Sequence, residues 1–280
     1  MTHYYRIGSL TVGIESDIDL SDTYATTPFL CEECEAEIKL IFQGTDNLEL
    51  PVGDVIFQNS SVRICKTDSG IEKLVFLPAS DKYAAVVKET EYAFICRYNK
   101  EHSKYFSTVV NCFNAVGMEK ILSHYDMFFL HCAFVVIDGK AVLFSGSAGI
   151  GKSTRAELLR KYANAYTVNQ DKALLGFENN CLTAYGSPVT GSSPIVRNEK
   201  YPVEAIVFLE KGEINKTELC KQSDALKRIV KNTVINTWDN DFYQSAIAFA
   251  TECVSSVKIY LSECNTDVES VSEQRRVLDV

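Results

Sequence analysis

The sequence has little positive charge: it holds 28 Lys and Arg against 37 Asp and Glu, for a formal net charge of −9 over 280 residues. Nucleic-acid backbones and anionic bilayers bind proteins through clustered cations, so an acidic chain is not expected to have either as its main partner. The deficit describes the whole chain and leaves room for a local basic patch around a phosphate site. We therefore predict no nucleic acid and no membrane among the partners.

Long apolar runs are also missing. The segment 128–137 is among the longest, is interrupted by His131, and falls well short of the roughly 20 residues that a membrane-spanning helix needs. The first residues, MTHYYRIGSLTVGIESD, lack the cationic start and apolar run of a secretory signal. Both absences predict a cytoplasmic protein.

Cysteine pairs at metal-binding spacing are nearly absent. Cys31 and Cys34 form one C-x-x-C pair, and no second pair lies nearby to complete a tetrahedral zinc site. In a reducing compartment most of the ten cysteines are expected to be small buried side chains. We predict two free thiols in a turn or at a strand end. An isolated redox pair is the alternative, which a thiol titration would detect.

What the sequence does contain is the composition of a globular chain, with 46% hydrophobic and 23% charged residues. Up to residue 104, short β segments alternate with turn signals and predict a β-rich N-terminal domain, an antiparallel sheet or sandwich. The segments are TVGIE, EIKLIF, DVIFQ, SVRICK, KLVFLPA, YAAVVK and YAFICRY. This domain, 1–104, shows no recognisable chemistry and is a candidate for presenting a substrate.

The pattern changes at residue 105, where apolar residues begin to recur at helical spacing up to residue 122. Beyond it, strands and helices mix, which predicts an α/β domain with a mixed sheet over 105–280. Strands are predicted at 128–137, 141–144, 173–177, 182–185, 205–209 and 257–261, with another ending near Asp171, and helices at 152–162 and from about 224 and 240. Asp138-Gly139 is a two-residue hairpin signal, so the strands on either side are predicted to pair antiparallel.

The most specific motif is GSAGIGKS, which fits G-x-x-x-x-G-K-[ST] at every fixed position and lies between an apolar strand and a helical run. A loop of this kind cradles phosphates with backbone N–H groups and a helix N-terminus. Lys152 is expected to bridge the terminal phosphates of ATP, and the Ser153 hydroxyl to hold Mg²⁺. A Gly/Ser-rich turn that merely links strand and helix is the alternative. The predicted nucleotide-binding residues are Gly146, Ser147, Ala148, Gly149, Ile150, Gly151, Lys152, Ser153 and Thr154.

Two residues are placed to act beside this loop. His131 lies in the strand one hairpin before it, and Asp171 closes the strand after the loop helix. If these strands are neighbours, both side chains arrive at the strand ends where α/β ligand sites form. A carboxylate there can take a proton or ligate Mg²⁺, and an imidazole can assist. Singly, a core histidine and a turn aspartate are the simpler interpretations.

In this context the sequence resembles the ATP-binding catalytic domain of HPr kinase/phosphorylase and its kinase-like relatives, which share a core with the nucleotide-dependent phosphoenolpyruvate carboxykinases. The resemblance is carried by LHCAFVVIDGKAVLFSGSAGIGKST, TVNQDKALL, AYGSPVTGSSP and EAIVFLEKG, over about residues 125–215. It implies a P-loop kinase that uses ATP and Mg²⁺, with catalytic roles for His131, Asp171 and Lys152. It also leaves a homo-oligomer open.

One departure from that family concerns the acidic residues. HPr kinases have two adjacent aspartates after the loop helix, whereas this chain has Asn169-Gln170-Asp171. Asp171 is therefore expected either to accept the proton or to ligate Mg²⁺ together with Ser153. The family's segment for its protein substrate is not found, so the acceptor is predicted only as a hydroxyl of a peptide, a protein or a small molecule.

Further candidates follow the strand at 182–185. By resemblance, Gly191, Ser192 and Ser193 line the site near phosphate or acceptor, although a plain loop is the alternative. Arg197 could pair with a transferring phosphoryl group. Glu210, at the end of an apolar strand, invites a Walker-B interpretation in which its carboxylate holds Mg²⁺.

The sequence thus favours a kinase that transfers the γ-phosphoryl group of ATP to a hydroxyl. One alternative is an NTPase switch or motor that uses water, but an N-K-x-D motif is missing and a hairpin-fed loop does not suit an all-parallel sheet. Another is a non-catalytic ATP-binding module that regulates a partner. A third is an enzyme acting on a small carboxylate, whose second metal site of His and Lys is not apparent.

Overall fold

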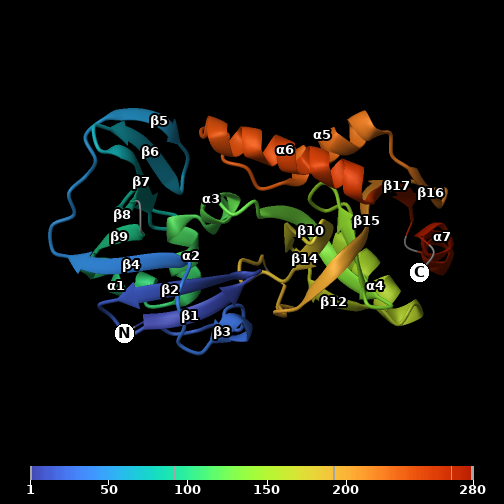
Figure 1. Ribbon diagram of the computed structural model, residues 1–280, viewed down its shortest axis with the longest axis horizontal. Helices are drawn as coiled ribbons and strands as arrows, with labels where there is room; N and C mark the ends of the chain where they lie inside the picture. The colour runs from blue at the N-terminus through green and yellow to red at the C-terminus, as the bar shows by residue number, and fades with distance from the viewer. Residues whose placement is uncertain (1, 91–92, 192, 266, 279–280) are drawn as a thin grey trace. The chain divides into compact units, whose positions relative to one another are not determined.

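The computed structural model describes residues 2–90, 93–191, 193–265 and 267–278 (Figure 1). The chain divides into two compact units, Met1–Met118 and Glu119–Val280. Within the described residues, no helix is both long enough and apolar enough to cross a bilayer.

The first unit is built on one nine-stranded sheet with the strand order β3-β1-β2-β4-β9-β8-β7-β6-β5. All the β segments expected from the sequence form strands. Its strands are β1 (Thr2–Ile7), β2 (Leu10–Ser16), β3 (Leu30–Cys31), β4 (Ile38–Thr45), β5 (Asp54–Gln58), β6 (Val62–Thr67), β7 (Gly70–Phe76), β8 (Tyr83–Glu89) and β9 (Phe94–Asn99).

The expected antiparallel arrangement is wrong for the middle of this sheet. β4 pairs parallel with β2 on one side and parallel with β9 on the other. Strands β5 to β9 follow one another as antiparallel neighbours, which brings β9 back beside β4. Strand direction depends on where the chain crosses over, and local hydrophobic patterns do not encode that.

Short helices cover one face of the first sheet. They are η1 (Thr27–Phe29), η2 (Lys100–His102), α1 (Ser103–Phe106) and α2 (Val109–Val116). Phe106 of α1 packs its ring 5.0 Å from that of Tyr98, and Phe113 of α2 lies 5.5 Å from the ring of Tyr5. The sequence placed the domain boundary at 104/105, which falls inside α1 and before α2. Their aromatic side chains pack on the first sheet, and the division falls after Met118.

The second unit is a mixed α/β structure, as the sequence predicted for this half. Its elements are α3 (Met118–Ser123), β10 (Phe128–Ile137), β11 (Lys140–Ser145), α4 (Lys152–Tyr162), β12 (Tyr166–Asn169), β13 (Lys172–Glu178), β14 (Cys181–Tyr185), β15 (Lys200–Lys211), β16 (Lys216–Leu219), α5 (Gln222–Asn232), α6 (Asn240–Ser256), β17 (Lys258–Cys264) and α7 (Val268–Leu278).

Two long strands organise its eight-stranded sheet. The first half of β10 pairs with β13, and its second half pairs antiparallel with β11 and β12. β15 pairs with β14 and then, parallel, with β11 and β17. The predicted hairpin is confirmed: Asp138 and Gly139 both have positive φ, at 48° and 78°, between β10 and β11.

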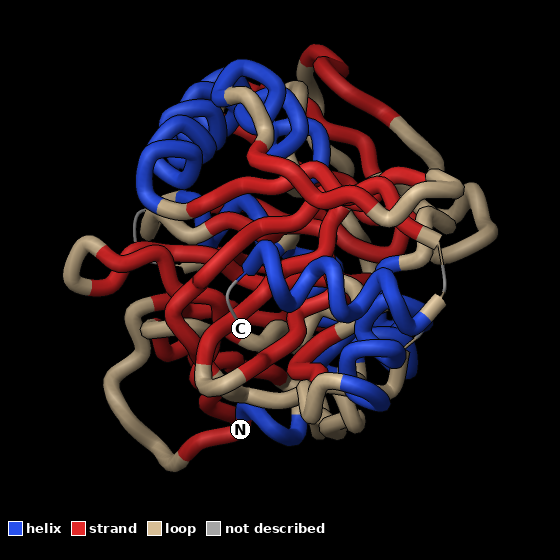
Figure 2. The backbone as a smooth tube through the Cα atoms, turned by 90° about the vertical axis from the view of Figure 1, so that its right-hand side faces the viewer, coloured by secondary structure: helices blue, strands red, loops and turns tan. Residues whose placement is uncertain are grey.

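Helices cover both faces of this sheet, as the blue helices on either side of the red strands in Figure 2 show. One core contains Phe128 and Phe208 and is closed by α5 and α6. The other contains Val142 and Phe144 and is closed by α4 and α7. The strand run that leads into the loop is therefore held rigidly from both sides.

No helix was predicted from the sequence at α7, where the last dozen residues have little hydrophobicity and could either fray or dock. Its Val271 and Leu278 enter the second core, and a buried arginine from α4 holds its first turn. Arg155 donates to Ser270 Oγ at 2.6 Å and to the Asn265 carbonyl at 2.9 Å. The tertiary contacts that stabilise α7 leave only a weak apolar pattern in the sequence.

Candidate nucleotide and catalytic site

The predicted loop connects β11 directly to α4, so the strand–loop–helix arrangement expected from the motif is present. Its first glycine is tightly placed: a Cβ at Gly146, whose φ is +140°, would lie 3.1 Å from the Leu209 carbonyl oxygen of β15. Residues 147–149, in contrast, are exposed. The loop is thus anchored at its start and open along its middle.

Helix α4 begins at Lys152 with an N-terminus that has no side-chain cap, because its N-cap is Gly151 with φ 111°. The first N–H groups of an uncapped helix are available to an anion, and the helix dipole favours one there. Ser153 and Thr154 are exposed in this first turn. This is the geometry that the motif requires of a phosphate-binding loop.

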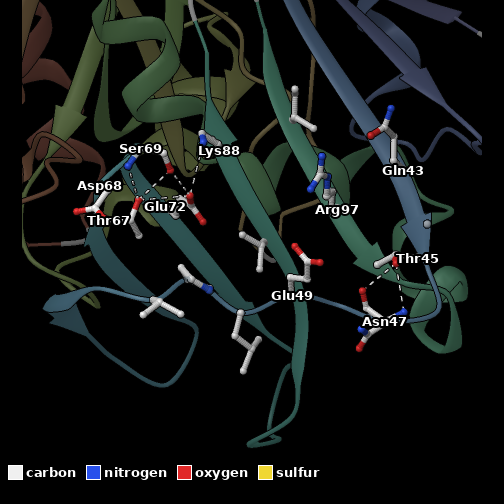
Figure 3. A pocket seen from close by; sticks show the side chains of 16 residues that line it. Gln43, Thr45, Asn47, Glu49, Thr67, Asp68, Ser69, Glu72, Lys88 and Arg97 are labelled. Carbon is white, nitrogen blue, oxygen red and sulfur yellow. Dashed lines mark hydrogen bonds and ion pairs between the residues drawn. The ribbon is translucent and has the colours of Figure 1, made fainter.

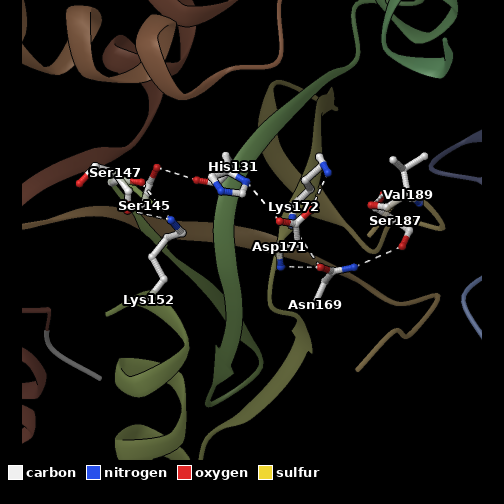
Figure 4. Close-up of polar contacts among 10 residues, drawn as sticks. His131, Ser145, Ser147, Lys152, Asn169, Asp171, Lys172, Ser187 and Val189 are labelled. Carbon is white, nitrogen blue, oxygen red and sulfur yellow. Dashed lines mark hydrogen bonds and ion pairs between the residues drawn. The ribbon is translucent and has the colours of Figure 1, made fainter. Parts of the chain in front are cut away.

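Lys152 lies folded across the loop. Its Nζ donates to the carbonyl oxygens of Gly146 at 3.0 Å and Ser147 at 3.2 Å, and the residue is only 8% exposed (Figure 4). Burial lowers the pKa of this amine below its ordinary value, while the charge of Asp171 opposes the shift. The ammonium group is therefore held against the backbone of the loop.

His131 lies beside the loop, as predicted. It is the one residue of β10 that is not buried, and its carbonyl accepts a 2.8 Å hydrogen bond from Ser145 Oγ, at the end of β11. Its Nδ1 lies 3.4 Å from Asp171 Oδ1. Burial, followed by the charge of Lys152, lowers the pKa of the imidazole, although Asp171 acts in the opposite direction.

Asp171 is held by its neighbours in the turn between β12 and β13. The buried Asn169 side chain accepts from the backbone N–H groups of Asp171 at 2.8 Å and Lys172 at 3.1 Å, and donates to the Ser187 carbonyl. The Asp171 carboxylate contacts the ammonium of Lys172 on one oxygen and His131 on the other. Neither Lys172 nor the role of Asn169 was expected from the sequence. Two features of the sequence could have indicated them. A lysine directly follows Asp171, and an asparagine stands two positions before it, where its side chain can accept from the backbone N–H groups that follow.

Part of the Gly/Ser/Pro-rich segment that follows β14 lies next to the turn that holds Asp171. A Cβ on Gly191 would lie 3.0 Å from Asp171 Oδ1, so this backbone passes directly over the carboxylate. Ser193 Oγ donates to Gln170 Oε1 at 3.0 Å, so it faces the same turn. Ser192 lies outside the described residues.

Arg197 is engaged elsewhere. Its Nε donates to the Thr167 carbonyl at 3.2 Å, a guanidinium nitrogen lies 3.8 Å from Glu199 Oε1, and the group sits over the Tyr166 ring. Glu210, at the end of β15, pairs with Arg228 of α5 at 2.6 Å. Within the described residues, neither the Arg197 nor the Glu210 side chain contacts His131 or Asp171.

A magnesium ion would find oxygen donors here. Ser153 offers an exposed hydroxyl, and Asp171 a carboxylate beside the loop. One or two protein oxygens with phosphate oxygens and waters are the usual Mg²⁺ coordination, so these residues fit the ion. No group of three or more His, Cys, Asp or Glu side chains in the described residues could hold a metal by itself.

A cavity of about 660 Å³ lies in the first unit on the sheet face away from the helices (Figure 3). Its wall combines both signs of charge, including Arg97 and Lys88 with Glu49 and Glu72. Lys88 Nζ lies 3.7 Å from Glu72 Oε1. The cavity contains no loop or residue pair of the kind found in the second unit.

Comparison with known proteins gives a distant structural likeness. No protein family and no curated protein matches the sequence. Among solved structures, the chain is similar to the Hpr(Ser) kinase/phosphatase from Coxiella burnetii, with 19% identity over 54% of this chain and 99% of that chain and a TM-score of 0.30. A likeness of this size leaves the functional argument to the residues of the chain itself.

Proposed function

We propose that the second unit is an ATP-dependent phosphotransferase that moves the γ-phosphoryl group to a hydroxyl of a peptide, a protein or a small molecule. The observation that carries the proposal is the position of Lys152 over an uncapped helix start, with the His131–Asp171 pair beside it. One part of this arrangement suits a triphosphate, and the other suits an acceptor that must lose a proton.

In the proposed reaction the protein acts by positioning and charge. Loop N–H groups and Lys152 hold the phosphates, while Ser153 and Asp171 hold Mg²⁺, which neutralises the phosphate charge when bound. Asp171 or His131 accepts the proton of the attacking hydroxyl, since their side chains adjoin at 3.4 Å. Gly191 and Ser193, next to Asp171 and Gln170, border the acceptor.

The contacts of Arg197 argue against giving it a phosphoryl-binding role without rearrangement, because its guanidinium is occupied by Thr167, Glu199 and Tyr166. Lys172 is better placed to act as a cation at the site, since its ammonium contacts Asp171 directly. A cation at this point orients the carboxylate. The first unit remains our candidate for presenting the acceptor.

Two substitutions separate binding from transfer. Lys152→Ala should abolish the ATP-induced rise in melting temperature, whereas Asp171→Asn should keep it. Asp171→Asn should instead lower phosphoryl transfer from labelled ATP by about 10²- to 10⁴-fold, the usual contribution of a positioned acid or base. His131→Ala, measured in parallel, shows which side chain matters more for the proton.

Unchanged ATP protection in Lys152→Ala would remove the loop assignment. Normal transfer by Asp171→Asn would remove the catalytic one and leave an ATP-binding module. Turnover that runs at full rate without any added acceptor would instead indicate a hydrolase, in which water replaces the hydroxyl.

A further inference from the structure

A cavity of about 640 Å³ opens beside the start of the nucleotide loop, between the end of β15 and helix α5. The loop forms one wall, the last residues of β15 the floor, and one face of α5 the other wall. Its lining residues are Gly146, Ser147, Ile150, Phe208, Leu209, Glu210, Lys211, Asp224, Lys227, Arg228, Lys231 and Asn232. We call it the lysine pocket.

The deepest cation of the pocket is fixed in place. Arg228 donates to Glu210 Oε1 at 2.6 Å, and its guanidinium lies over the Phe208 ring at 5.9 Å. The Asn232 side chain donates to the Arg228 carbonyl at 2.8 Å and secures the same turn of α5. The charges of Arg228 and Glu210 therefore balance each other, and the rest of the pocket determines its net charge.

The lining also holds three lysines, whose positive charges are not balanced by paired carboxylates of the described residues. Lys211, Lys227 and Lys231 are exposed, and no carboxylate of the described residues pairs with any of them. Lys227 and Lys231 stand four residues apart on α5, a spacing at which like charges repel. A solvated helix face would account for each lysine alone, but not for their convergence on one cavity that the nucleotide loop borders.

Among the lining residues, Lys211, Lys227, Arg228 and Lys231 face only two carboxylates, Glu210 and Asp224, which leaves two positive charges in excess (four minus two). The whole chain carries −9. A local excess of this sign in an acidic protein concentrates anions at that point.

We propose that the lysine pocket binds the phosphate group of a second ligand next to the bound triphosphate. A phosphate monoester carries about −1.5 to −2 charges at pH 7, which matches the excess, whereas a carboxylate would leave half of it uncompensated. The inference rests on the proposed function only for the triphosphate at the loop. The phosphate belongs either to a hydroxyl-bearing phosphate ester or to free inorganic phosphate.

The test is calorimetric titration of the full chain, with its loop saturated by Mg²⁺ and a non-hydrolysable ATP analogue, at constant ionic strength. Glycerol 3-phosphate and inorganic phosphate are titrated separately. We expect one saturable site per chain, weakened about tenfold or more in Lys227→Ala/Lys231→Ala because two charge-assisted hydrogen bonds to the phosphate are removed. Lys227→Arg/Lys231→Arg should restore binding. The affinity for the ATP analogue should stay the same in all of these variants.

Lys161→Ala/Lys258→Ala is the matched control, because it removes the same charge from exposed positions of the second unit outside the pocket. An equal weakening in this control, or no phosphate binding by the loaded wild-type chain, would overturn the proposal. Tighter binding of one probe identifies the source as ester or free phosphate.

The two proposals can fail separately. If the ATP analogue does not bind, the proposed function falls, and the pocket is then tested by the same titrations on Lys152→Ala, in which the loop lysine is gone. Phosphate binding that persists there and still depends on Lys227 and Lys231 supports the pocket alone.

Discussion

The two units each contain a large mixed sheet, but they expose it differently. The first covers one face with short helices and leaves the other to a cavity, whereas the second is closed by helices on both faces. The chemistry lies in the more enclosed unit. A sheet fixed from both sides holds its strand ends still, and strand ends are where the loop and Asp171 lie.

The two cavities also differ in the net charge of their lining residues. In the first unit Lys88 and Arg97 face Glu49, Asp68 and Glu72, so the lining has one negative charge in excess (three minus two). In the lysine pocket the excess is positive. Two concave surfaces of similar size thus suit different ligands, because net charge and not volume decides which ions they attract.

The largest expected effect tests whether the enclosed sheet supports the loop. Phe144 is fully buried just before the end of β11, the strand that leads into the loop. Phe144→Ala should lower the free energy of unfolding by about 3–5 kcal/mol. Val52 in the first unit is 90% exposed, and Val52→Ala should stay within about 0.5 kcal/mol. Urea unfolding measures both. Similar values for the two variants would mean that the second sheet is not the rigid support described above.

A smaller effect concerns α7, which helps to close the second sheet. Arg155→Met removes the hydrogen bonds that a buried guanidinium donates to Ser270 and Asn265. Because the apolar side chain also relieves the desolvation of a buried charge, the net loss of stability should be about 1.5–3 kcal/mol. Hydrogen exchange over 268–278 should accelerate. The exposed Arg160, paired with Glu157, is the control, and Arg160→Ala should change stability by only about 0.5 kcal/mol. Unaltered exchange in Arg155→Met would show that α7 docks without this arginine.

The smallest effect is the dependence of stability on pH, which should be alike in both units. Burial raises the pKa of Cys112 in the first unit and of Cys132 in the second to about 12, from an ordinary value of 9.0. Above pH 9 the unfolded chain loses these protons and the folded chain keeps them, so stability falls as pH rises. The slope is about 1.4 kcal/mol per pH unit for each thiol.

Urea unfolding between pH 8 and about 10.5 measures this slope, and Cys112→Ala or Cys132→Ala should each reduce it. Alkylation of the native chain at pH 8 should leave both thiols unmodified while the exposed Cys181 reacts. Rapid labelling of Cys132 but not Cys112 would mean that the second unit opens more readily than the first, although helices close both faces of its sheet.

Local signals predicted the part of the site that depends on short stretches of chain. Asp138-Gly139 fixed the hairpin because few dipeptides adopt two positive φ values, and the loop motif needed only its own residues and the flanking elements. The meeting of His131 with Asp171 followed from the expected adjacency of their strands, and β10 pairs with β13 at His131 and Lys172.

Features that depend on distant contacts were missed. The parallel pairing of β4 with β2 and β9 results from chain crossovers, which hydrophobic alternation does not record. The lysine pocket combines α5 with the loop, some 75 residues apart in the numbering from Gly146 to Gln222. An i, i+4 lysine pair in a helix gives no sign by itself of the cavity that it lines.

The tight contact at Gly146 has a consequence for how this chain can diverge. Any side chain at this position would meet the backbone of Leu209, so the loop could not keep its place against β15. The exposed residues 147–149 meet no such limit. Distant relatives of this protein should therefore retain a glycine at the start of the loop even where its middle residues have drifted beyond recognition, which makes this position the one to anchor an alignment on.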